Sequence, residues 1–291
     1  MRIAVVGGGG QLGAAIVHEY SATANHHDIQ SFSHAELETT DDAAVVAALE
    51  DTRPELIINA SAFNDVDGAE DRCVDALQVN AFAVRTMARV AERLNAVFVH
   101  YGTDFVFDGT ATRPYTETQR PNPRSVYGAS KMLGEWFALD VPKGYVLRVE
   151  SLFGRAPNGP ESKGSVATIL NGLKNGSSPR VFEDRTVSPT YVPDAARATR
   201  ELLERGAAPG LYHCVNSGHC SWLEFAVELA RQLGVEPTLT RVKVADVRLR
   251  AQRPQFCALS NDKMRQAGVS MPTWQDALAR FARAVTAAPS S

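Results

Sequence analysis

The sequence has 291 residues, enough for one large α/β domain or two modest ones around a substantial buried core. Its 30 lysines and arginines nearly balance 33 aspartates and glutamates, and the formal net charge of -3 argues against binding to nucleic acid or to an anionic membrane. No apolar run is long enough to span a bilayer and a glycine-rich turn follows the first apolar stretch, so we predict a cytoplasmic protein with free thiols.

The first twenty residues predict a buried strand, a glycine turn and a helix, which together begin a βαβ unit. Gly7, Gly10 and Gly13 are spaced as G-x-x-G-x-x-G. The first two glycines allow the backbone to turn beside a pyrophosphate, and the third allows the helix to pack closely on the strand. With Gln11 and Leu12 at the start of the helix, the segment predicts a dinucleotide-binding turn.

Apolar strands and helices then alternate. We expect strands at residues 28–32, 56–60, 97–101 and 145–149, and helices at 42–49 and 74–94. This alternation predicts an α/β fold, a Rossmann-type doubly wound parallel sheet covered on both faces. Residues 1–150 should form an NAD(P)-binding domain, to which a helix at 193–206 returns. Residues 151–192 and 207–291 should form a smaller carboxy-terminal α/β substrate-binding region.

Tyr127 and Lys131 lie four residues apart, so in a helix their side chains share one face, and Thr103 stands near the end of an earlier strand. A phenol, an ammonium and a hydroxyl brought together can deliver a proton to a carbonyl oxygen. Ligands of open α/β sheets bind at the carboxyl ends of the strands, so these side chains should surround one crevice with the glycine turn. The small residues after the third strand, expected beside a flat cofactor, are Ala60, Ser61 and Ala62.

Several longer segments are typical of one family. They are GGGGQLG at 7–13, INASAFNDVDGAED at 58–71, VN at 79–80, TDFVFDG at 103–109, YGASKMLGE at 127–135, SPTYVPDAA at 188–196 and RPQFCALSNDK at 253–263. On these segments the chain resembles the extended short-chain dehydrogenase/reductases and, within them, the dTDP-4-dehydrorhamnose reductases. The resemblance implies an NAD(P)H-dependent oxidoreductase that reduces the C4 ketone of a nucleotide-linked 4-keto-6-deoxysugar, with Thr103, Tyr127 and Lys131 as the catalytic triad.

The chemistry of these three residues agrees with that activity. Tyr127 is the expected general acid, which gives its phenolic proton to the carbonyl oxygen as hydride arrives at the carbon. Lys131 is expected to lower the pKa of Tyr127 below its reference of about 10 and to bond the nicotinamide ribose. Thr103 is expected to donate a hydrogen bond to the developing alkoxide.

The end of the second predicted strand bears on the choice of cofactor. Ser33 stands where the family often has an aspartate that holds the ribose 2′-hydroxyl, and His34 follows it, so a 2′-phosphate would meet no repulsion. We therefore expect NADPH, with NADH as the alternative. By family position, Glu38 and Thr39 approach the adenine, and Asn80 belongs to the same cofactor site.

The expected substrate site departs from the family pattern. Ser151 occupies a position that usually holds a tryptophan, so a stacking platform for the sugar is missing. Glu150 is either an acceptor for a sugar hydroxyl or a structural hydrogen-bond partner. Asp104, beside Thr103, is expected in the substrate site. Arg253 either pairs with the substrate diphosphate or forms a surface salt bridge.

Other interpretations remain at this stage. The segment HCVNSGHC at 213–220 matches no common zinc spacing, and Ser221 with Glu224 predicts a capping box instead, so we assign no metal ligand. The chain could act as another sugar-nucleotide reductase, epimerase or dehydratase. Around AQRP at 251–254 it also resembles the methionine adenosyltransferase beta subunit, a non-catalytic NADP-binding regulatory protein. We expect a nucleotide-sugar substrate and a monomer or homodimer.

Overall fold

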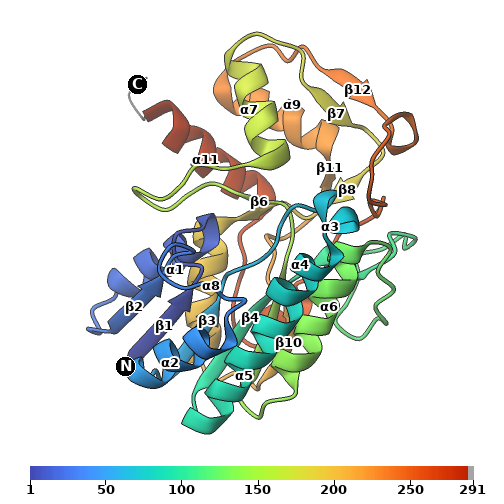
Figure 1. Ribbon diagram of the computed structural model, residues 1–291. Helices are drawn as coiled ribbons and strands as arrows, with labels where there is room; N and C mark the ends of the chain where they lie inside the picture. The colour runs from blue at the N-terminus through green and yellow to red at the C-terminus, as the bar shows by residue number, and fades with distance from the viewer. Residues whose placement is uncertain (288–291) are drawn as a thin grey trace.

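A six-stranded parallel sheet forms the centre of the larger part of the molecule (Figure 1). The computed structural model describes residues 1–287. The strands are β1 (Arg2–Val6), β2 (Asp28–Phe32), β3 (Leu56–Asn59), β4 (Val97–Thr103), β5 (Gly144–Val149) and β10 (Gly210–His213). Their order is β10-β5-β4-β3-β1-β2, and every neighbouring pair is parallel. The chain winds outward in both directions from β1, which confirms the predicted doubly wound sheet.

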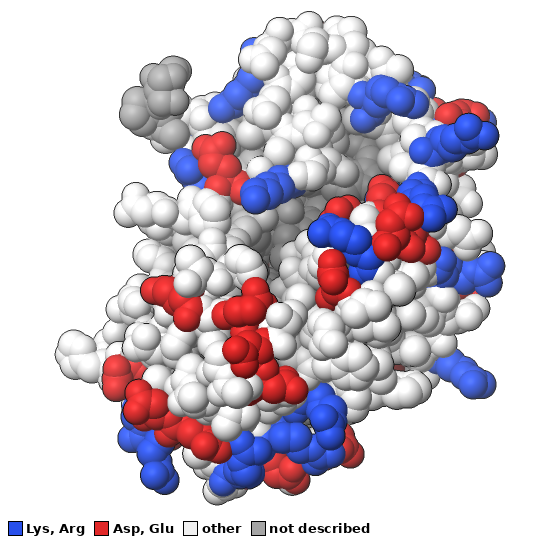
Figure 2. Space-filling view, viewed as in Figure 1, with Lys and Arg blue, Asp and Glu red and all other residues white. Residues whose placement is uncertain are grey.

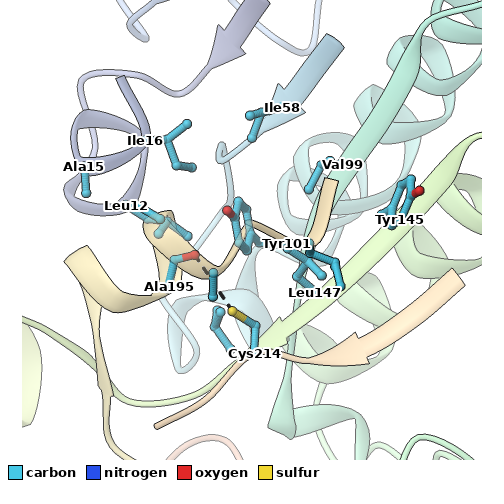
Figure 3. Close-up of a cluster of buried hydrophobic side chains, with 14 of the residues drawn as sticks. Leu12, Ala15, Ile16, Ile58, Val99, Tyr101, Tyr145, Leu147, Ala195 and Cys214 are labelled. Atoms are coloured by element: carbon cyan, nitrogen blue, oxygen red, sulfur yellow. Dashed lines mark hydrogen bonds between the residues drawn. The ribbon is translucent and has the colours of Figure 1, made fainter. Parts of the chain in front are cut away.

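Helices cover both faces of this sheet, because its strands are apolar on both sides. One face is covered by α1 (Gln11–Ser21) and α8 (Val192–Glu204), and the other by α2 (Asp42–Thr52), α5 (Ala83–Leu94) and α6 (Val126–Leu139). Figure 3 shows the first of these cores, where Ile16 of α1, Tyr101 of β4 and Ala195 of α8 converge. The Sγ of Cys214 lies 3.9 Å from the carbonyl oxygen of Ala195 in the same cluster.

The segment 74–94 is not the single regular helix that its pattern predicts. It consists of α4 (Cys73–Leu77), a π-helical turn η1 (Gln78–Phe82) and α5. The wider turn changes the phase of the helix and directs Asn80 inward. There its amide donates to the carbonyl of Phe63 at 3.1 Å and to Ser130 Oγ at 3.0 Å. The π-helical turn therefore places the side chain of Asn80 beside α6, the helix that carries Tyr127.

A smaller part is built mainly from the second half of the chain and lies beside the sheet (Figure 1). Its elements are β6 (Leu152–Phe153), α7 (Gly164–Lys174), β7 (Arg180–Phe182), β8 (Thr186–Val187), β9 (Thr190–Tyr191), β11 (Cys220–Ser221), α9 (Trp222–Leu233), β12 (Thr240–Val242), η3 (Val244–Asp246) and α11 (Trp274–Ala287). Its core is rich in aromatic rings, among them Phe153, Phe225 and Phe281. The predicted capping box of Ser221 and Glu224 is present at the start of α9.

The chain crosses between the two parts more than once. The sequence places residues 210–213 in the substrate-binding region, whereas the structure places them in β10, the edge strand of the large sheet, beside β5. Helix α8, which precedes β10, packs against α1. The short helices α3 (Gly68–Asp71) and η2 (Asp104–Val106) lie in loops after β3 and β4, and α10 (Asp262–Gln266) packs beside β10.

Two simpler expectations concern the thiols and membrane segments. The four cysteines, Cys73, Cys214, Cys220 and Cys257, are free, and all but Cys73 are buried. Within residues 1–287, no helix has both the length and the apolar character needed to cross a bilayer.

Candidate active site

A cavity of about 590 Å³ opens at the carboxyl ends of the central strands. The face in Figure 2 is hollowed between the larger and smaller parts, with charges of both signs beside the hollow. The residues around the cavity that the sequence predicted for the site are Gly10, Gln11, Leu12, Ala60, Ser61, Ala62, Thr103, Asp104, Tyr127, Lys131 and Ser151. Segments that lie far apart in the sequence thus meet at the edge where ligands of such sheets bind.

The glycine turn lies against the third strand with no room for side chains. Gly7 has a φ of +82°, and a Cβ on it would lie 2.6 Å from the backbone nitrogen of Ser61. A Cβ on Gly13 would lie 2.2 Å from the carbonyl oxygen of Gly7. The turn therefore brings bare backbone and the N-terminus of α1 to the cavity, a cradle that suits a pyrophosphate.

Helix α6 carries two of the predicted catalytic side chains. It begins at Ser125, whose hydroxyl accepts from the backbone N–H of Gly128 at 3.1 Å. A Cβ on Gly128 would lie 2.3 Å from the carbonyl oxygen of Phe105, so only glycine allows α6 this close to the loop after β4. The close approach sets the Tyr127 ring edge-on against Phe105, with centroids 5.5 Å apart, and brings its phenol toward Thr103.

The protonation of this pair differs from the expectation. The Nζ of Lys131 donates to the carbonyl oxygen of Tyr101 at 2.6 Å, and burial lowers the pKa of Lys131 to about 8. Burial also raises the pKa of Tyr127 to about 12, against the opposing effect of a hydrogen bond with Thr103. The prediction that Lys131 lowers the tyrosine pKa below 10 is wrong here, because burial dominates and the ammonium is bonded elsewhere. Tyr127 therefore keeps its proton at neutral pH.

Thr103 ends β4 and is held from both sides. Its hydroxyl donates to Oδ1 of Asp104 at 3.0 Å and accepts from the backbone N–H of Phe105 at 3.3 Å. Thr103 and Asp104 are both almost fully buried, although both border the cavity. The hydroxyl thus has a fixed position at the cavity wall beside the phenol of Tyr127.

A buried polar pair that the sequence analysis missed supports the loop after β3. Oδ1 of Asn59 accepts from the backbone N–H of Ser61 at 3.0 Å and from its hydroxyl at 2.6 Å. Nδ2 of Asn59 lies 3.2 Å from Nδ1 of His100, whose pKa is well below its usual value because of burial and the nearby charge of Lys131. The sequence contained a signal for this pair. His100 interrupts an apolar strand, and Asn59 ends the strand that precedes it.

The side chains predicted for the adenosine half do not border this cavity. They lie at the end of β2, where a Cβ on Gly9 would sit 3.2 Å from the Cβ of Ser33. His34 is exposed and its Nε2 lies 3.8 Å from a carboxylate oxygen of Glu38, whereas Thr39 is buried. At the same strand end, the backbone N–H of Ser33 donates to Oε2 of Glu36 at 2.7 Å, a carboxylate that the sequence analysis did not consider.

Three residues predicted for the substrate site, Ser151, Glu150 and Arg253, lie in different surroundings. Ser151 borders the cavity in a left-handed backbone conformation, with a φ of +47°. Glu150 is buried behind the cavity wall, where its Oε2 accepts from the backbone N–H of Ser188 at 2.8 Å, as a structural partner would. Arg253 pairs with Asp67 across 2.6 Å. It borders a second hollow of about 500 Å³, which is lined by the segment between β4 and α6 and by residues after β12.

The possible metal ligands that lie close together in the structure are not those of the segment 213–220. Within residues 1–287, the one group of three possible ligands close enough to share an ion is Asp104, Glu150 and Cys257, with ligand atoms within 4.8 Å of one another. The guanidinium of Arg185 contacts Cys257 Sγ at 3.7 Å, and its charge opposes a cation there. In the segment 213–220, Nδ1 of His213 instead bonds the carbonyl of Ser260 at 3.1 Å.

Comparison with known proteins places this site in a family. The model of the RmlD substrate binding domain matches residues 1–287. The chain belongs to that family. The dTDP-4-dehydrorhamnose reductase of Aggregatibacter actinomycetemcomitans is 32% identical, with 95% of this chain and 97% of that protein covered. The spore coat polysaccharide biosynthesis protein SpsK of Bacillus subtilis is 29% identical, with 96% of each covered.

Solved structures agree with membership of the RmlD substrate binding domain family. The crystal structure of dTDP-4-dehydrorhamnose reductase from Bacillus anthracis in complex with NADP has a TM-score of 0.89 and 30% identity, covering 96% of this chain and 98% of that one. The corresponding reductase structure from Clostridium acetobutylicum has a TM-score of 0.90, 29% identity, and coverage of 98% and 100%. UDP-glucose 4-epimerase of Thermus thermophilus, at 18% identity and a TM-score of 0.80, shares the fold.

Proposed function

We propose that this chain reduces the C4 ketone of a nucleotide-linked 4-keto-6-deoxysugar with NADPH, as the names of its dTDP-4-dehydrorhamnose reductase relatives suggest. The observation that carries the proposal is the meeting of Thr103, Tyr127 and Lys131 around one cavity with the glycine turn. A regulatory nucleotide-binding protein has no need of a phenol and a hydroxyl at that point, so their presence favours catalysis.

The residues present fit a nicotinamide cofactor. The glycine turn and the N-terminus of α1 would hold the pyrophosphate, and the small residues 60–62 would lie beside the cofactor. Lys131, whose Nζ reaches the cavity wall, would bond the nicotinamide ribose. When bound, NADPH supplies the hydride that goes to the carbonyl carbon.

The side chains would manage the charge that develops on the carbonyl oxygen. Tyr127 breaks its O–H bond and gives the proton to that oxygen, so the ketone becomes an alcohol and the tyrosine becomes a phenolate. Thr103 would turn its hydroxyl from Oδ1 of Asp104 to the same oxygen, and so stabilise the charge before the proton arrives.

The substrate side of the cavity would differ from that of a sugar site with an aromatic platform. Ser151 offers a small polar side chain there, so the sugar would be held by hydrogen bonds more than by stacking. Arg253 would have to exchange its pairing with Asp67 for the substrate diphosphate. We propose that the cavity separates the two binding regions. The cofactor would bind on the side of the glycine turn, and the sugar nucleotide on the side of Ser151.

A spectrophotometric screen tests this function. The purified chain is mixed with NADPH or NADH and with dTDP-, GDP- or UDP-linked 4-keto-6-deoxysugars, and loss of the reduced cofactor is followed. We expect NADPH to be oxidised in the presence of at least one of these sugars. NADPH binding without turnover of any of them would contradict the proposal and favour a regulatory role.

A further inference from the structure

The short helix α3 lies beside the start of α6, the helix that carries Tyr127 (Figure 1). Glu70 of α3 directs its carboxylate to that point, where Oε1 accepts from the backbone N–H of Val126 at 2.8 Å. Val126 is the first residue of α6 and directly precedes Tyr127. The first N–H groups of a helix have no partner within the helix, so an acceptor must come from elsewhere. For Val126 that acceptor is a side chain of a separate element.

Two side chains hold the backbone N–H groups on either side of Tyr127. The Ser125 hydroxyl accepts from Gly128 at 3.1 Å, and the Glu70 carboxylate accepts from Val126. Ser125 belongs to the same turn and moves with it, whereas Glu70 does not. The carboxylate also meets the partial positive charge at the N-terminus of α6, which strengthens the bond. Of these two residues, Glu70 is therefore the one that fixes the turn relative to the rest of the cavity.

The ring of Tyr127 packs on the same short helix. Tyr127 forms a buried cluster with Ala69 of α3 and Ala76 of α4, and its ring stands edge-on to Phe105. Ala69 directly precedes Glu70, so one segment of α3 supports both the ring of Tyr127 and the backbone before it. The phenolic oxygen lies at the far end of the side chain, so a small shift of this backbone moves the oxygen further.

Helix α3 is itself anchored on both sides of Glu70. Asp67, which precedes α3, accepts at Oδ1 from the backbone N–H of Ala251 at 2.9 Å. Asp71, which ends α3, pairs with Arg250 across 2.7 Å. The second pair is exposed and contributes little, so Asp67 is the main anchor. The carboxylate of Glu70 is thus presented to α6 from a fixed support.

We propose that Glu70 is a positioning residue for the reduction, which acts through the backbone of Val126 and sets where the phenol of Tyr127 lies in the cavity. The inference rests on the proposed function, because the position of a proton donor matters only when a carbonyl oxygen receives the proton. A misplacement of about 1 Å can cost about 10²-fold in rate. Glu70 does not line the cavity, so its effect on the reaction passes through Tyr127.

Kinetics of three variants test this role. Glu70→Gln keeps an acceptor oxygen for Val126, and its kcat should stay close to that of the parent. Glu70→Ala removes the acceptor, and its kcat should fall about tenfold, the shift in the positional equilibrium that one such hydrogen bond supports, with unchanged affinity for NADPH. Glu70→Leu keeps the bulk without the acceptor; it should behave like Glu70→Ala and replaces it if that variant does not fold.

The matched control is Glu224→Ala. The Oε2 of Glu224 accepts from the backbone N–H of Ser221 at 2.6 Å at the start of α9, so the variant also removes a carboxylate from a helix start. Its kcat should equal that of the parent, because α9 does not carry Tyr127.

Hydrogen exchange tests the position of the turn without a need for activity. Deuterium uptake by peptides that cover the start of α6 should be faster in Glu70→Ala than in the parent and in Glu70→Gln, since the N–H of Val126 loses its acceptor. In Glu224→Ala the faster uptake should appear at the start of α9 instead.

A double-mutant comparison tests whether Glu70 acts through the phenol. In the Tyr127→Phe background, measured with enzyme in excess over substrate, Glu70→Ala should leave the residual rate nearly unchanged, because the group that it positions is gone. An equal fold-loss with and without the phenol would mean a general loosening of the site.

The outcomes separate the role of Glu70 from the proposed function. Parental kcat in Glu70→Ala, a Gln variant as slow as the Ala variant, or the equal fold-loss just described would each overturn the positioning role. Unchanged exchange at the start of α6 in Glu70→Ala would overturn it as well, whether or not the parent turns over a ketosugar. A parent that shows the exchange difference but reduces none of the sugars would contradict the proposed function alone.

Discussion

At the scale of single residues, burial decides what the catalytic candidates can do. Tyr127 and Lys131 are recognisable from their spacing, but the pKa of Tyr127 rises to about 12 and that of Lys131 falls to about 8, both mainly because of burial. A phenol that holds its proton suits a general acid for reduction. The spacing could identify the pair, but it could not give the direction of the pKa shift, which depends on what surrounds the helix.

Replacement of this phenol should stop the reaction and spare the cofactor site. For Tyr127→Phe we expect kcat to fall by at least about 10²-fold, because the proton donor is lost, while NADPH binding changes little. NADPH oxidation gives kcat, and fluorescence titration gives the affinity. Tyr145→Phe is the control, since its hydroxyl bonds the carbonyl of Ala207 at the far side of the sheet. Turnover by Tyr127→Phe close to that of the parent would contradict the mechanism.

At the scale of elements, strand β10 joins the large sheet to the smaller part through a buried histidine. His213 ends β10, its Nδ1 bonds the carbonyl of Ser260 at 3.1 Å, and its Nε2 lies 3.5 Å from the guanidinium of Arg148. Burial, and then the charge of Arg148, lower the pKa of His213 to about 3 from its usual 6.5. The imidazole is therefore neutral in the folded protein at pH values where the unfolded chain binds a proton.

This difference makes stability depend on pH. Because the folded pKa is depressed, the contribution of His213 is fully present above pH 6.5 and is lost as the pH falls toward 3. From pH 6.5 to pH 5 the loss should approach about 2 kcal/mol in the free energy of unfolding, at about 1.4 kcal/mol per pH unit. Urea unfolding of the parent and His213→Asn at both pH values measures it. Equal pH dependence in the two proteins would show that His213 does not titrate this way.

At the scale of the whole molecule, the part that holds the large sheet is completed by residues far along the chain. Ala198 and Leu202 of α8 are fully buried in the core shared with α1, and β10 pairs with β5. A boundary at residue 150 would remove both elements and expose apolar surface on that face of the sheet. Strand β10 lies in the sequence between elements of the smaller part but belongs to the large sheet. The smaller part is therefore not one continuous segment that could be expressed alone.

We therefore expect a fragment of residues 1–150 not to fold cooperatively. Loss of α8 leaves Ile16 and Leu12 of α1 without cover, and uncovered apolar surface favours a loosely packed or aggregated state. Circular dichroism during heating and binding of a hydrophobic dye compare the fragment with the full chain. A sharp thermal transition without dye binding would mean that the first 150 residues form a domain by themselves.

The sequence by itself determined the parallel sheet, the glycine turn and the membership of Thr103, Tyr127 and Lys131 in one site. These follow from local patterns, since strand and helix periods, turn glycines and residues at strand ends depend on neighbours along the chain. Only the tertiary structure decided the burial of Glu150, the carboxylate of Glu36 at the end of β2 and the place of β10 in the sheet. Each depends on contacts between distant segments, which set burial, charge and pairing and leave no local pattern.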